Sequence, residues 1–304
     1  MRPAPGVSMI VLAYNDAPAL PALIAGLNQV LAPMTREFEI IVVDDGSHDA
    51  TPEVIASLAG VDALRLVRHP RNRGVGAAFR TGVEAARFEI VGYIDGDGQL
   101  VPGDLVPLLS ELEHGDAVSG IRARRADPAL RIALSRMYNR VVRSLFGLTV
   151  SDVNAGLKLY RRRFLNAVGP IESQGSFYDT EILVKGLAAG LRVRERRIHH
   201  LPRRHGRGLG ASLRSIDSVL QSITSPGMRR YRAPTLTARL IHWMLRLAAC
   251  GSRWTVGRSS NARETAASGS TVSGSDRAGA GCAGTRRPRD RRRSRRSRGS
   301  GARG

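Results

Sequence analysis

The stretch Phe88-Glu89-Ile90-Val91-Gly92-Tyr93-Ile94, followed by Asp95-Gly96-Asp97-Gly98-Gln99, decides the fold of this chain. Its first part is mostly β-branched or aromatic and stops at a Gly-rich turn, which is typical of a buried strand. Because side chains alternate along a strand, Asp95 and Asp97 can point the same way. Two carboxylates at a strand end suit Mg²⁺ or Mn²⁺, especially where a substrate phosphate completes the coordination shell. A plain polar turn would explain the same residues.

Strand-like and helix-like stretches alternate around this segment through the first 121 residues. The strand-like runs are Val7–Ala13, Phe38–Asp44, Ala63–Arg68, Phe88–Asp95 and Asp116–Ile121, and the helix-like stretches lie near 17–31, 50–59, 74–86 and 102–113. This alternation predicts an α/β fold with right-handed crossovers and a mostly parallel sheet flanked by helices. Ligands of such sheets gather at the carboxyl ends of the strands. Asp44-Asp45 and the Asp95/Asp97 pair should therefore line one edge.

The pattern changes after residue 130. Arg131–Phe146 reads as a basic helix whose apolar side is formed by Leu134, Met137, Val141, Val142 and Leu145. A strand (Leu157–Arg161), a helix (Tyr178–Ala189), a strand (Leu191–Ile198) and a basic loop (Arg203–Gly210) follow. We interpret this half as a continuation of the same domain, which we place at residues 1–230.

Charge and composition limit the classes of function. The 304 residues carry a net charge of +21, and 42% of them are hydrophobic, which is enough for a core. Two cysteines, Cys250 and Cys282, provide neither a disulfide framework nor a cysteine metal site. We find no signal peptide and no apolar run long enough to span a membrane. A basic body favours an anionic substrate or an anionic membrane surface.

The C-terminal part departs from the rest of the chain. Within residues 231–250, Leu236, Leu240, Trp243 and Leu247 follow a helical period, so this segment either lies on a membrane surface or packs on the domain. Residues 251–304 hold fourteen Arg and three acids with few large apolar side chains, which predicts a disordered basic tail. The tail could bind nucleic acid or anionic lipid, but we favour a solvated or frame-altered end without a role.

The segment after the second predicted strand carries a second pair of acids. Asp44 and Asp45 can accept hydrogen bonds from a nucleobase N–H or from ribose hydroxyls, and Gly46 permits a tight turn. A helix-capping turn explains Ser47 and Asp49, but it does not explain two adjacent acids before them.

Four motifs together resemble the family 2 glycosyltransferases of the GT-A fold, over roughly residues 7–225. They are Ala13-Tyr14-Asn15-Asp16, Asp44-Asp45-Gly46-Ser47, Asn72-Arg73-Gly74-Val75-Gly76-Ala77-Ala78 and Asp95-Gly96-Asp97-Gly98-Gln99. The resemblance implies an inverting transferase that uses a nucleotide-diphosphate sugar and Mg²⁺ or Mn²⁺. It implies nucleotide-sugar contacts at Ala13, Tyr14, Asp16, Asp44, Asp45, Asp95 and Gly96, and metal contacts at Asp97, Gln99 and Asp95. Leu12 and Asp16 depart from the Pro and Glu that are usual in the family.

A narrower resemblance is to dolichol-phosphate mannose synthases and bacterial polyprenyl-phosphate glycosyltransferases. Gln99, Arg122, the Ser135-Arg136 pair and the loop Arg203-Arg204-His205-Gly206 match residues of that subgroup. The resemblance implies a polyprenyl phosphate acceptor held by Arg122, Ser135, Arg136 and Arg204, with catalysis by Asp95, Asp97, Arg122 and Arg136. It also implies peripheral membrane contact at the cytoplasmic face. Relatives often continue into membrane helices, which is why we suspect an altered C-terminus here.

The chemistry of attack agrees with a phosphate acceptor. A hydroxyl acceptor needs a general base, whereas a phosphate monoester is already an anion near neutral pH and needs positioning by arginines. If the acceptor is a saccharide or another hydroxyl compound, Asp179 or Glu181 would be the base. Nucleic-acid binding through the tail and nucleotidyl transfer are less favoured readings. His199 and His200 are adjacent on a strand, so they should face opposite ways and not share a metal.

Overall fold

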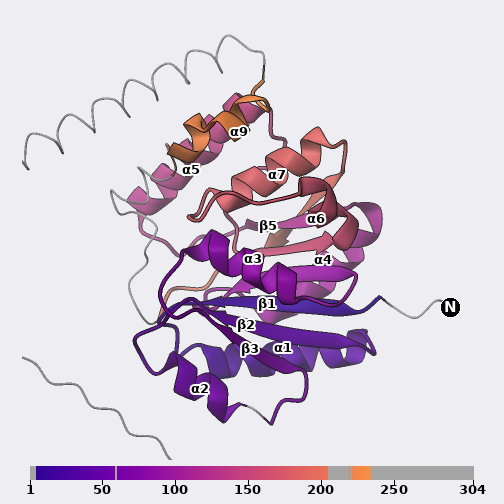
Figure 1. The fold of residues 1–304 in the computed structure, drawn as a ribbon, viewed down its shortest axis with the longest axis vertical. Helices are drawn as coiled ribbons and strands as arrows, with labels where there is room; N and C mark the ends of the chain where they lie inside the picture. The colour runs from indigo at the N-terminus through magenta and orange to yellow at the C-terminus, as the bar shows by residue number, and fades with distance from the viewer. Residues whose placement is uncertain (1–4, 59, 205–218, 220, 234–304) are drawn as a thin grey trace, which may run out of the picture. The chain divides into compact units, whose positions relative to one another are not determined.

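A single mixed sheet organises the chain (Figure 1). The computed structural model describes residues 5–58, 60–204, 219 and 221–233. Within these residues seven strands pair in the order β3-β2-β1-β4-β6-β5-β7. Their bounds are β1 (Val7–Ala13), β2 (Phe38–Asp44), β3 (Leu64–Arg68), β4 (Ile90–Asp95), β5 (Ala117–Arg122), β6 (Leu157–Arg161) and β7 (Val193–Ile198).

Strand direction determines which residues meet at the edge of the sheet. β6 runs antiparallel to both of its neighbours, and the other pairs in the sheet are parallel. The amino end of β6 therefore reaches the edge where the other strands have their carboxyl ends. Its register with β4 places Leu157 opposite Ile94 and Lys158 opposite Tyr93. Residues just before and inside β6 consequently lie beside Asp95.

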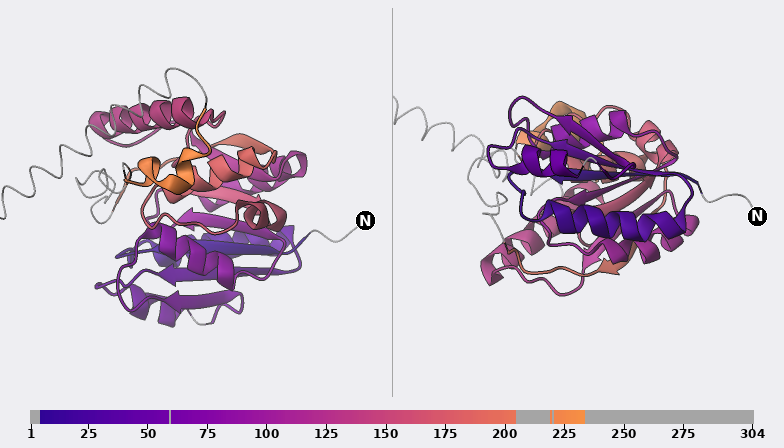
Figure 2. Two further views of the ribbon diagram at one scale, coloured as in Figure 1. Left: turned by 45° about the horizontal axis from the view of Figure 1, so that its top comes forward. Right: turned by 90° about the horizontal axis from the view of Figure 1, so that it is seen from below.

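Helices cover both faces of the sheet (Figure 2). One face packs against α1 (Leu20–Met34), α2 (Thr51–Ser57) and α4 (Leu105–Glu111), with short 3₁₀ turns η1 (Pro102–Asp104) and η2 (Leu112–His114) beside α4. The other face packs against α3 (Val75–Ala85), α6 (Arg162–Val168) and α7 (Tyr178–Ala188). The central strands are buried on both faces, as their continuous apolar runs predict.

A third apolar cluster attaches α5 (Ala129–Phe146) and α9 (Pro226–Arg229) to the outer side of α7 (Figure 1). Within the described residues, α5 joins this cluster only from Tyr138 onward. The predicted apolar side of the helix is therefore correct for Val142 and Leu145, which are buried, and wrong for its first half. Leu134 is 38% exposed and Met137 is 60% exposed.

The predicted elements agree with the observed ones to within a few residues, and the mostly parallel α/β sheet is confirmed. Helix α6 and the antiparallel direction of β6 were not predicted. The amphipathic segment 236–247, the basic tail 251–304, both cysteines and His205 lie outside the described residues. No helix among the described residues has the length and apolar character needed to cross a membrane.

Candidate active site

A cavity of about 660 Å³ opens at the carboxyl edge of β1, β2 and β4, and we call it the acidic cavity. Of the predicted nucleotide-sugar and metal residues, those that line it are Ala13, Tyr14, Asp16, Asp45, Asp95, Gly96 and Asp97. They come from three different strand ends, because parallel strands bring their carboxyl ends to one edge.

The turn after β1 is locked to the turn after β2. Asn15 adopts a left-handed backbone with a φ of 57°. Its amide donates to the Ser47 hydroxyl at 2.9 Å, and its side-chain oxygen accepts from the His48 amide at 2.8 Å. This turn aims Asp16 into the acidic cavity, where burial raises the pKa of its carboxyl to about 6.

The two acids after β2 have different surroundings. Asp45 faces the acidic cavity, and its carboxylate binds the His69 ring at 2.6 Å and accepts from the amides of Arg73 (2.9 Å) and Gly74 (2.8 Å). Asp44 is fully buried, accepts from the Ser47 amide at 2.9 Å and pairs with Arg68 at 3.1 Å. Contrary to expectation, Asp44 does not reach the cavity, because alternation along β2 turns it the other way.

Asp95 and Asp97 lie side by side at the end of β4. Burial, followed by the nearby negative charge of Asp97, raises the pKa of Asp95 to about 8. Gly156 leaves room for the Asp95 carboxylate, since a Cβ atom at that position would overlap its Oδ2 atom. Asp97 pairs with Arg203 at 2.5 Å and accepts from the Gln99 amide at 3.0 Å.

A buried ammonium lies beneath these acids. Lys158 is fully buried and donates to the Tyr93 hydroxyl at 2.8 Å and to the Ala155 carbonyl at 2.6 Å. It also pairs with Asp179 at 3.0 Å, and Asp179 in turn accepts from the Tyr93 hydroxyl at 2.7 Å. Burial raises the pKa of Asp179, which lines the acidic cavity while both of these partners hold it.

Glu181, which lies on α7 together with Asp179, has a structural role. Its carboxylate pairs with Lys185 at 2.6 Å and accepts from the amides of Glu172 and Ser173, each at 2.9 Å. These bonds hold the loop 170–176 against α3, where Gln174 accepts from the Gly76 amide at 2.7 Å. The approach is so close that a Cβ on Gly74 would lie 2.6 Å from the Gln174 carbonyl oxygen. Glu181 does not line the acidic cavity, whereas Gln174 does.

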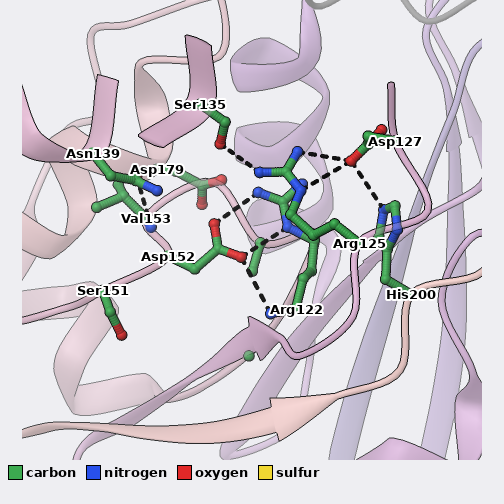
Figure 3. Close-up of polar contacts among 12 residues, drawn as sticks. Arg122, Arg125, Asp127, Ser135, Asn139, Ser151, Asp152, Val153, Asp179 and His200 are labelled. Atoms are coloured by element: carbon green, nitrogen blue, oxygen red, sulfur yellow. Dashed lines mark hydrogen bonds and ion pairs between the residues drawn. The ribbon is translucent and has the colours of Figure 1, made fainter. Parts of the chain in front are cut away.

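Two of the predicted acceptor-phosphate residues, Arg122 and Ser135, are each bound by a neighbouring side chain (Figure 3). Arg122 makes a two-pronged pair with Asp152 at 2.8 and 2.7 Å, and the Ser135 hydroxyl accepts from Arg125 at 2.6 Å. Neither residue lines the acidic cavity, because each is held by its neighbour.

The other two predicted residues also lie elsewhere. Arg136 lines a second cavity of about 650 Å³, together with Arg140 and Arg143, and we call this the arginine cavity. Arg204 is exposed, whereas its neighbour Arg203 points into the acidic cavity. Among the residues of this loop that the structure describes, Arg203 and not Arg204 lines the acidic cavity.

Gln99 and the two histidines also differ in their surroundings. Gln99 is only 5% exposed, and its side-chain amide donates to the Leu201 carbonyl at 3.1 Å, so it holds the 199–204 segment and does not line the acidic cavity. His199 binds Asp104 at 2.8 Å with its side chain 78% exposed, while His200 is 5% exposed and lies 4.0 Å from Asp127. The two rings face different ways, as expected.

The acidic cavity fits a divalent cation only in part. Among the described residues, no three His, Cys, Asp or Glu side chains form a complete metal site. Asp95 and Asp97 provide hard carboxylate oxygens, and burial of Asp95, followed by the charge of Asp97, raises the pKa of the Asp95 carboxyl. A cation bound jointly by these oxygens and by substrate phosphates suits Mg²⁺ or Mn²⁺.

Sequence reasoning assigned no role to Gly156 or Lys158, and it quoted Arg203 in the matched loop without assigning it a contact. A signal for Lys158 was present, because it and Lys185 are the only lysines among 47 basic residues. Both are buried, and each pairs with a carboxylate of α7, Asp179 and Glu181 respectively. Lysine's compact ammonium fits where arginine's larger planar fork would not.

Comparisons with known proteins agree with this site. Residues 8–169 match the model of the family described as Glycosyl transferase family 2. The undecaprenyl-phosphate 4-deoxy-4-formamido-L-arabinose transferase of Aeromonas hydrophila is 30% identical over 221 residues, which cover 72% of this chain and 67% of the relative. Its counterpart in Pseudomonas fluorescens is 31% identical over 229 residues, covering 74% and 66%. The chain thus spans about two thirds of the length of these relatives.

Solved structures agree on the fold. A mannosyltransferase from Pyrobaculum calidifontis, in complex with GDP-Man and Mn²⁺, has a TM-score of 0.55 at 22% identity, covering 88% of this chain and 76% of its own. Glucosyl-3-phosphoglycerate synthase from Mycobacterium tuberculosis, in complex with Mn²⁺, UDP and phosphoglyceric acid, has a TM-score of 0.56 at 20% identity, covering 73% and 80%. These likenesses confirm the GT-A-like α/β fold.

Proposed function

The chain belongs to the family 2 glycosyltransferases, and from that premise we propose that it transfers a monosaccharide, with inversion, from a nucleotide-diphosphate sugar to a polyprenyl phosphate. The relatives named as undecaprenyl-phosphate transferases support this acceptor class. A lipid acceptor implies that the reaction takes place at a membrane, and we propose its cytoplasmic face. The identity of the sugar is left to the assay below.

The donor occupies the acidic cavity in this proposal. Tyr14, Asp16 and Asp45 border the nucleotide, and the end of β4 faces the sugar and diphosphate. Asp97, with Asp95 beside it, would hold Mg²⁺ or Mn²⁺. A bound divalent cation supplies charge neutralisation of the diphosphate leaving group. Arg203 adds a cationic side chain at the same place, since it already pairs with Asp97.

One observation carries the choice of a phosphate acceptor: neither candidate base is free to act. Asp179 is held by the Lys158 ammonium and the Tyr93 hydroxyl, and Glu181 is held by Lys185 and two backbone amides. A hydroxyl acceptor would need a general base, and these two carboxylates were the candidates for that role. A phosphate oxygen attacks as an anion and needs only positioning, for which Arg131 and Arg203 line the cavity.

The decisive experiment compares two acceptors that differ only in the phosphate. Purified protein with Mn²⁺ and radiolabelled UDP-glucose, GDP-mannose or UDP-GlcNAc is incubated with a short-chain polyprenyl phosphate or with the matching polyprenol. We expect transfer from one of the donors to the phosphate and none to the alcohol. The anomeric configuration of the product, read by NMR, should be opposite to that of the donor.

Two outcomes would contradict the proposal. Comparable transfer to polyprenol would show that a general base operates, and Asp179→Asn would then abolish that activity. In a parallel incubation with a saccharide in place of the lipids, transfer to the saccharide alone would move the acceptor to the hydroxyl class. A matched control is Glu181→Gln, which removes a carboxylate that lies outside the cavity.

A further inference from the structure

The imidazole ring of His69, the first residue after β3, is buried behind the acidic cavity and has no part in the proposed function. It is 4% exposed and does not line the cavity. Its Nδ1 atom lies 2.6 Å from the Asp45 carboxylate, and its Nε2 atom lies 2.9 Å from the hydroxyl of Thr81 on α3. Because a carboxylate oxygen only accepts, Nδ1 carries a proton and donates it. The ring is thus held at both ends, and it reaches the cavity through Asp45.

This contact limits what Asp45 can still accept. A carboxylate offers about four lone-pair sites, two on each oxygen. Oδ1 of Asp45 accepts from the His69 ring and from the Arg73 amide at 2.9 Å, whereas Oδ2 accepts from the Gly74 amide at 2.8 Å. Among the described residues these are its side-chain partners, so Oδ1 is saturated and Oδ2 keeps one lone pair. A ligand in the acidic cavity can therefore donate one hydrogen bond to Asp45.

The turn that follows His69 places unused hydrogen-bond donors beside this acceptor. Asn72 and Arg73 both line the acidic cavity. Within the described part of the chain, neither the Asn72 amide nitrogen nor the Arg73 guanidinium donates a hydrogen bond. The turn packs closely on the preceding loop, since a Cβ on Gly46 would lie 2.6 Å from the Asn72 backbone nitrogen. The site thus presents one acceptor next to free donors.

The order of the strands places Asp45 at the base end of a nucleotide sugar. β1 separates β2 from β4 in the sheet, so Asp45 and Asp95 lie two strand spacings apart along the edge, or roughly 10 Å. The proposed function places the diphosphate at Asp95. A ribose separates the diphosphate from the base in every nucleotide sugar, so the group that meets Asp45 should be the base.

The bases differ in how many N–H groups they bring to such a site. Guanine has a ring N–H and an amino group, and adenine and cytosine each have an amino group, whereas uracil has one ring N–H between two carbonyl oxygens. One lone pair satisfies the single N–H of uracil, and the two carbonyls suit the donors of Asn72 and Arg73. Each other base would leave an N–H without a partner, which should cost about tenfold in affinity.

We propose that His69 is a positioning residue that sets the base specificity of the donor site: by occupying Oδ1 of Asp45 it leaves a single acceptor, which selects a uracil nucleotide. The proposal rests on the proposed function, because it identifies the nucleotide of the same donor. A ribose hydroxyl would use the same lone pair but would leave the donors of Asn72 and Arg73 unused.

Isothermal titration calorimetry of the full chain with Mn²⁺ and nucleoside diphosphates tests the base assignment. UDP should bind at least about tenfold more tightly than GDP, CDP or ADP. 3-Methyl-UDP lacks the N3–H and should lose about tenfold relative to UDP, and 2′-deoxy-UDP should lose less. Equal binding of UDP and GDP, or a loss with 2′-deoxy-UDP as large as that with 3-methyl-UDP, would overturn the assignment. This comparison needs no variant.

The role of His69 is measured by the ratio of the dissociation constants of GDP and UDP. His69→Leu frees Oδ1 of Asp45 for a second N–H of guanine, so the ratio should fall at least about fivefold. His69→Asn keeps an amide N–H near the position of Nδ1 and should keep most of the wild-type ratio. The matched control, His114→Leu, changes an exposed histidine of η2 and should alter neither constant.

A purely structural role for His69 predicts a different result. Equal weakening of UDP and GDP by His69→Leu would leave the ratio unchanged and would overturn the proposal. Thr81→Val is a milder second variant, which releases only the far end of the ring and should lower the ratio in the same direction by a smaller factor. An unchanged ratio in this variant, with the ratio also unchanged in His69→Leu, would show that the ring has no part in specificity.

Failure of this inference is separable from failure of the proposed function. Tighter binding of GDP than UDP, together with transfer from a GDP-sugar to polyprenyl phosphate, would refute the base assignment and leave the proposed function standing. Absence of binding by all four nucleoside diphosphates with Mn²⁺ would remove the donor site, and both would fail. Transfer from a UDP-sugar to polyprenol would refute the phosphate acceptor and support the uracil assignment.

Discussion

Replacing Lys158 by Met removes the one cation that, among the described residues, pairs directly with the buried Asp179, and it should destabilise the protein strongly. The ammonium is fully buried and has three partners: Tyr93, Ala155 and Asp179. Methionine fills a similar volume, so the packing is largely kept. The change therefore tests the charge and not the shape.

The size of the stability loss depends on which partner of Lys158 is left without an interaction. The Tyr93 hydroxyl has one proton, which it still donates to Asp179 at 2.7 Å, and the Ala155 carbonyl lies 3.2 Å from the same hydroxyl oxygen. Asp179, which is 5% exposed, loses its ion pair. Leaving one charge of a buried pair without its partner costs about 3–5 kcal/mol. That is a large part of the roughly 5–15 kcal/mol that stabilises a typical domain.

Urea unfolding followed by circular dichroism measures this loss, with Arg36→Met as the control at an exposed residue. Asp179→Asn combined with Lys158→Met should cost much less than the sum of the single changes, because no lone buried charge remains. A loss below about 1 kcal/mol in the Lys158→Met protein, or additive single effects, would refute the reasoning.

The stability that the Lys158→Met protein loses relative to the wild type, its deficit, should change with pH in a definite direction. Burial already raises the pKa of Asp179 in the folded protein, and removing Lys158 raises it further. A carboxyl whose pKa is higher in the folded than in the unfolded state costs stability once pH exceeds its unfolded value near 4. The deficit of the Lys158→Met protein should therefore be largest near neutral pH and should shrink towards about pH 4. A deficit that grew on acidification would contradict this account.

Three further predictions concern the end of β4. Asp97→Ala should abolish sugar transfer while leaving the melting temperature nearly unchanged, since the lost pair with Arg203 is offset by removal of a negative charge beside Asp95; near-normal turnover would remove Asp97 from the metal site. The pKa of Asp95 is raised to about 8, so the metal-free protein should lose stability as pH rises from about 4 to about 8. Melting curves recorded with EDTA measure this slope, and Asp95→Asn should remove it. Equal slopes in the wild type and the variant would contradict the raised pKa. Gly156→Ala places a methyl group where the Asp95 carboxylate lies, so it should lower kcat about 100-fold. The same change should weaken Mn²⁺ binding measured by EPR. Unchanged Mn²⁺ affinity would show that Asp95 is not a ligand.

Local sequence patterns predicted the sheet well because its central strands are continuous apolar runs. The bounds of β1 and β2 follow directly from Val7–Ala13 and Phe38–Asp44. Parallel topology then brought Asp16, Asp45, Asp95 and Asp97 to one edge without any knowledge of side-chain contacts. The acids of the site were therefore largely predictable.

The basic side of the site was less predictable, since it depends on which of two adjacent residues points inward. Arg203 lines the acidic cavity and Arg204 does not, and Asp45 lines it whereas Asp44 is buried behind it. A resemblance in sequence also cannot reveal that Arg122 is held by Asp152, thirty residues away along the chain. Likewise, the helical period of α5 indicates which residues share its apolar side, but it does not indicate which of them are buried against other elements.

The position of β6 determines the order in which this protein can be assembled. β5 precedes β6 in the sequence, yet β6 lies between β4 and β5 in the sheet. A growing chain that has reached Arg122 can form the β3-β2-β1-β4 half, but β5 has no neighbour in the sheet until residues 157–161 emerge. The nucleotide-facing turns can thus form early, whereas Gly156 and Lys158 reach Asp95 only when β6 closes the gap between the two halves. Long-range pairing of this kind is slow, so insertion of one five-residue strand becomes the step that joins β5 to the rest of the sheet and brings Gly156 and Lys158 to the edge at Asp95.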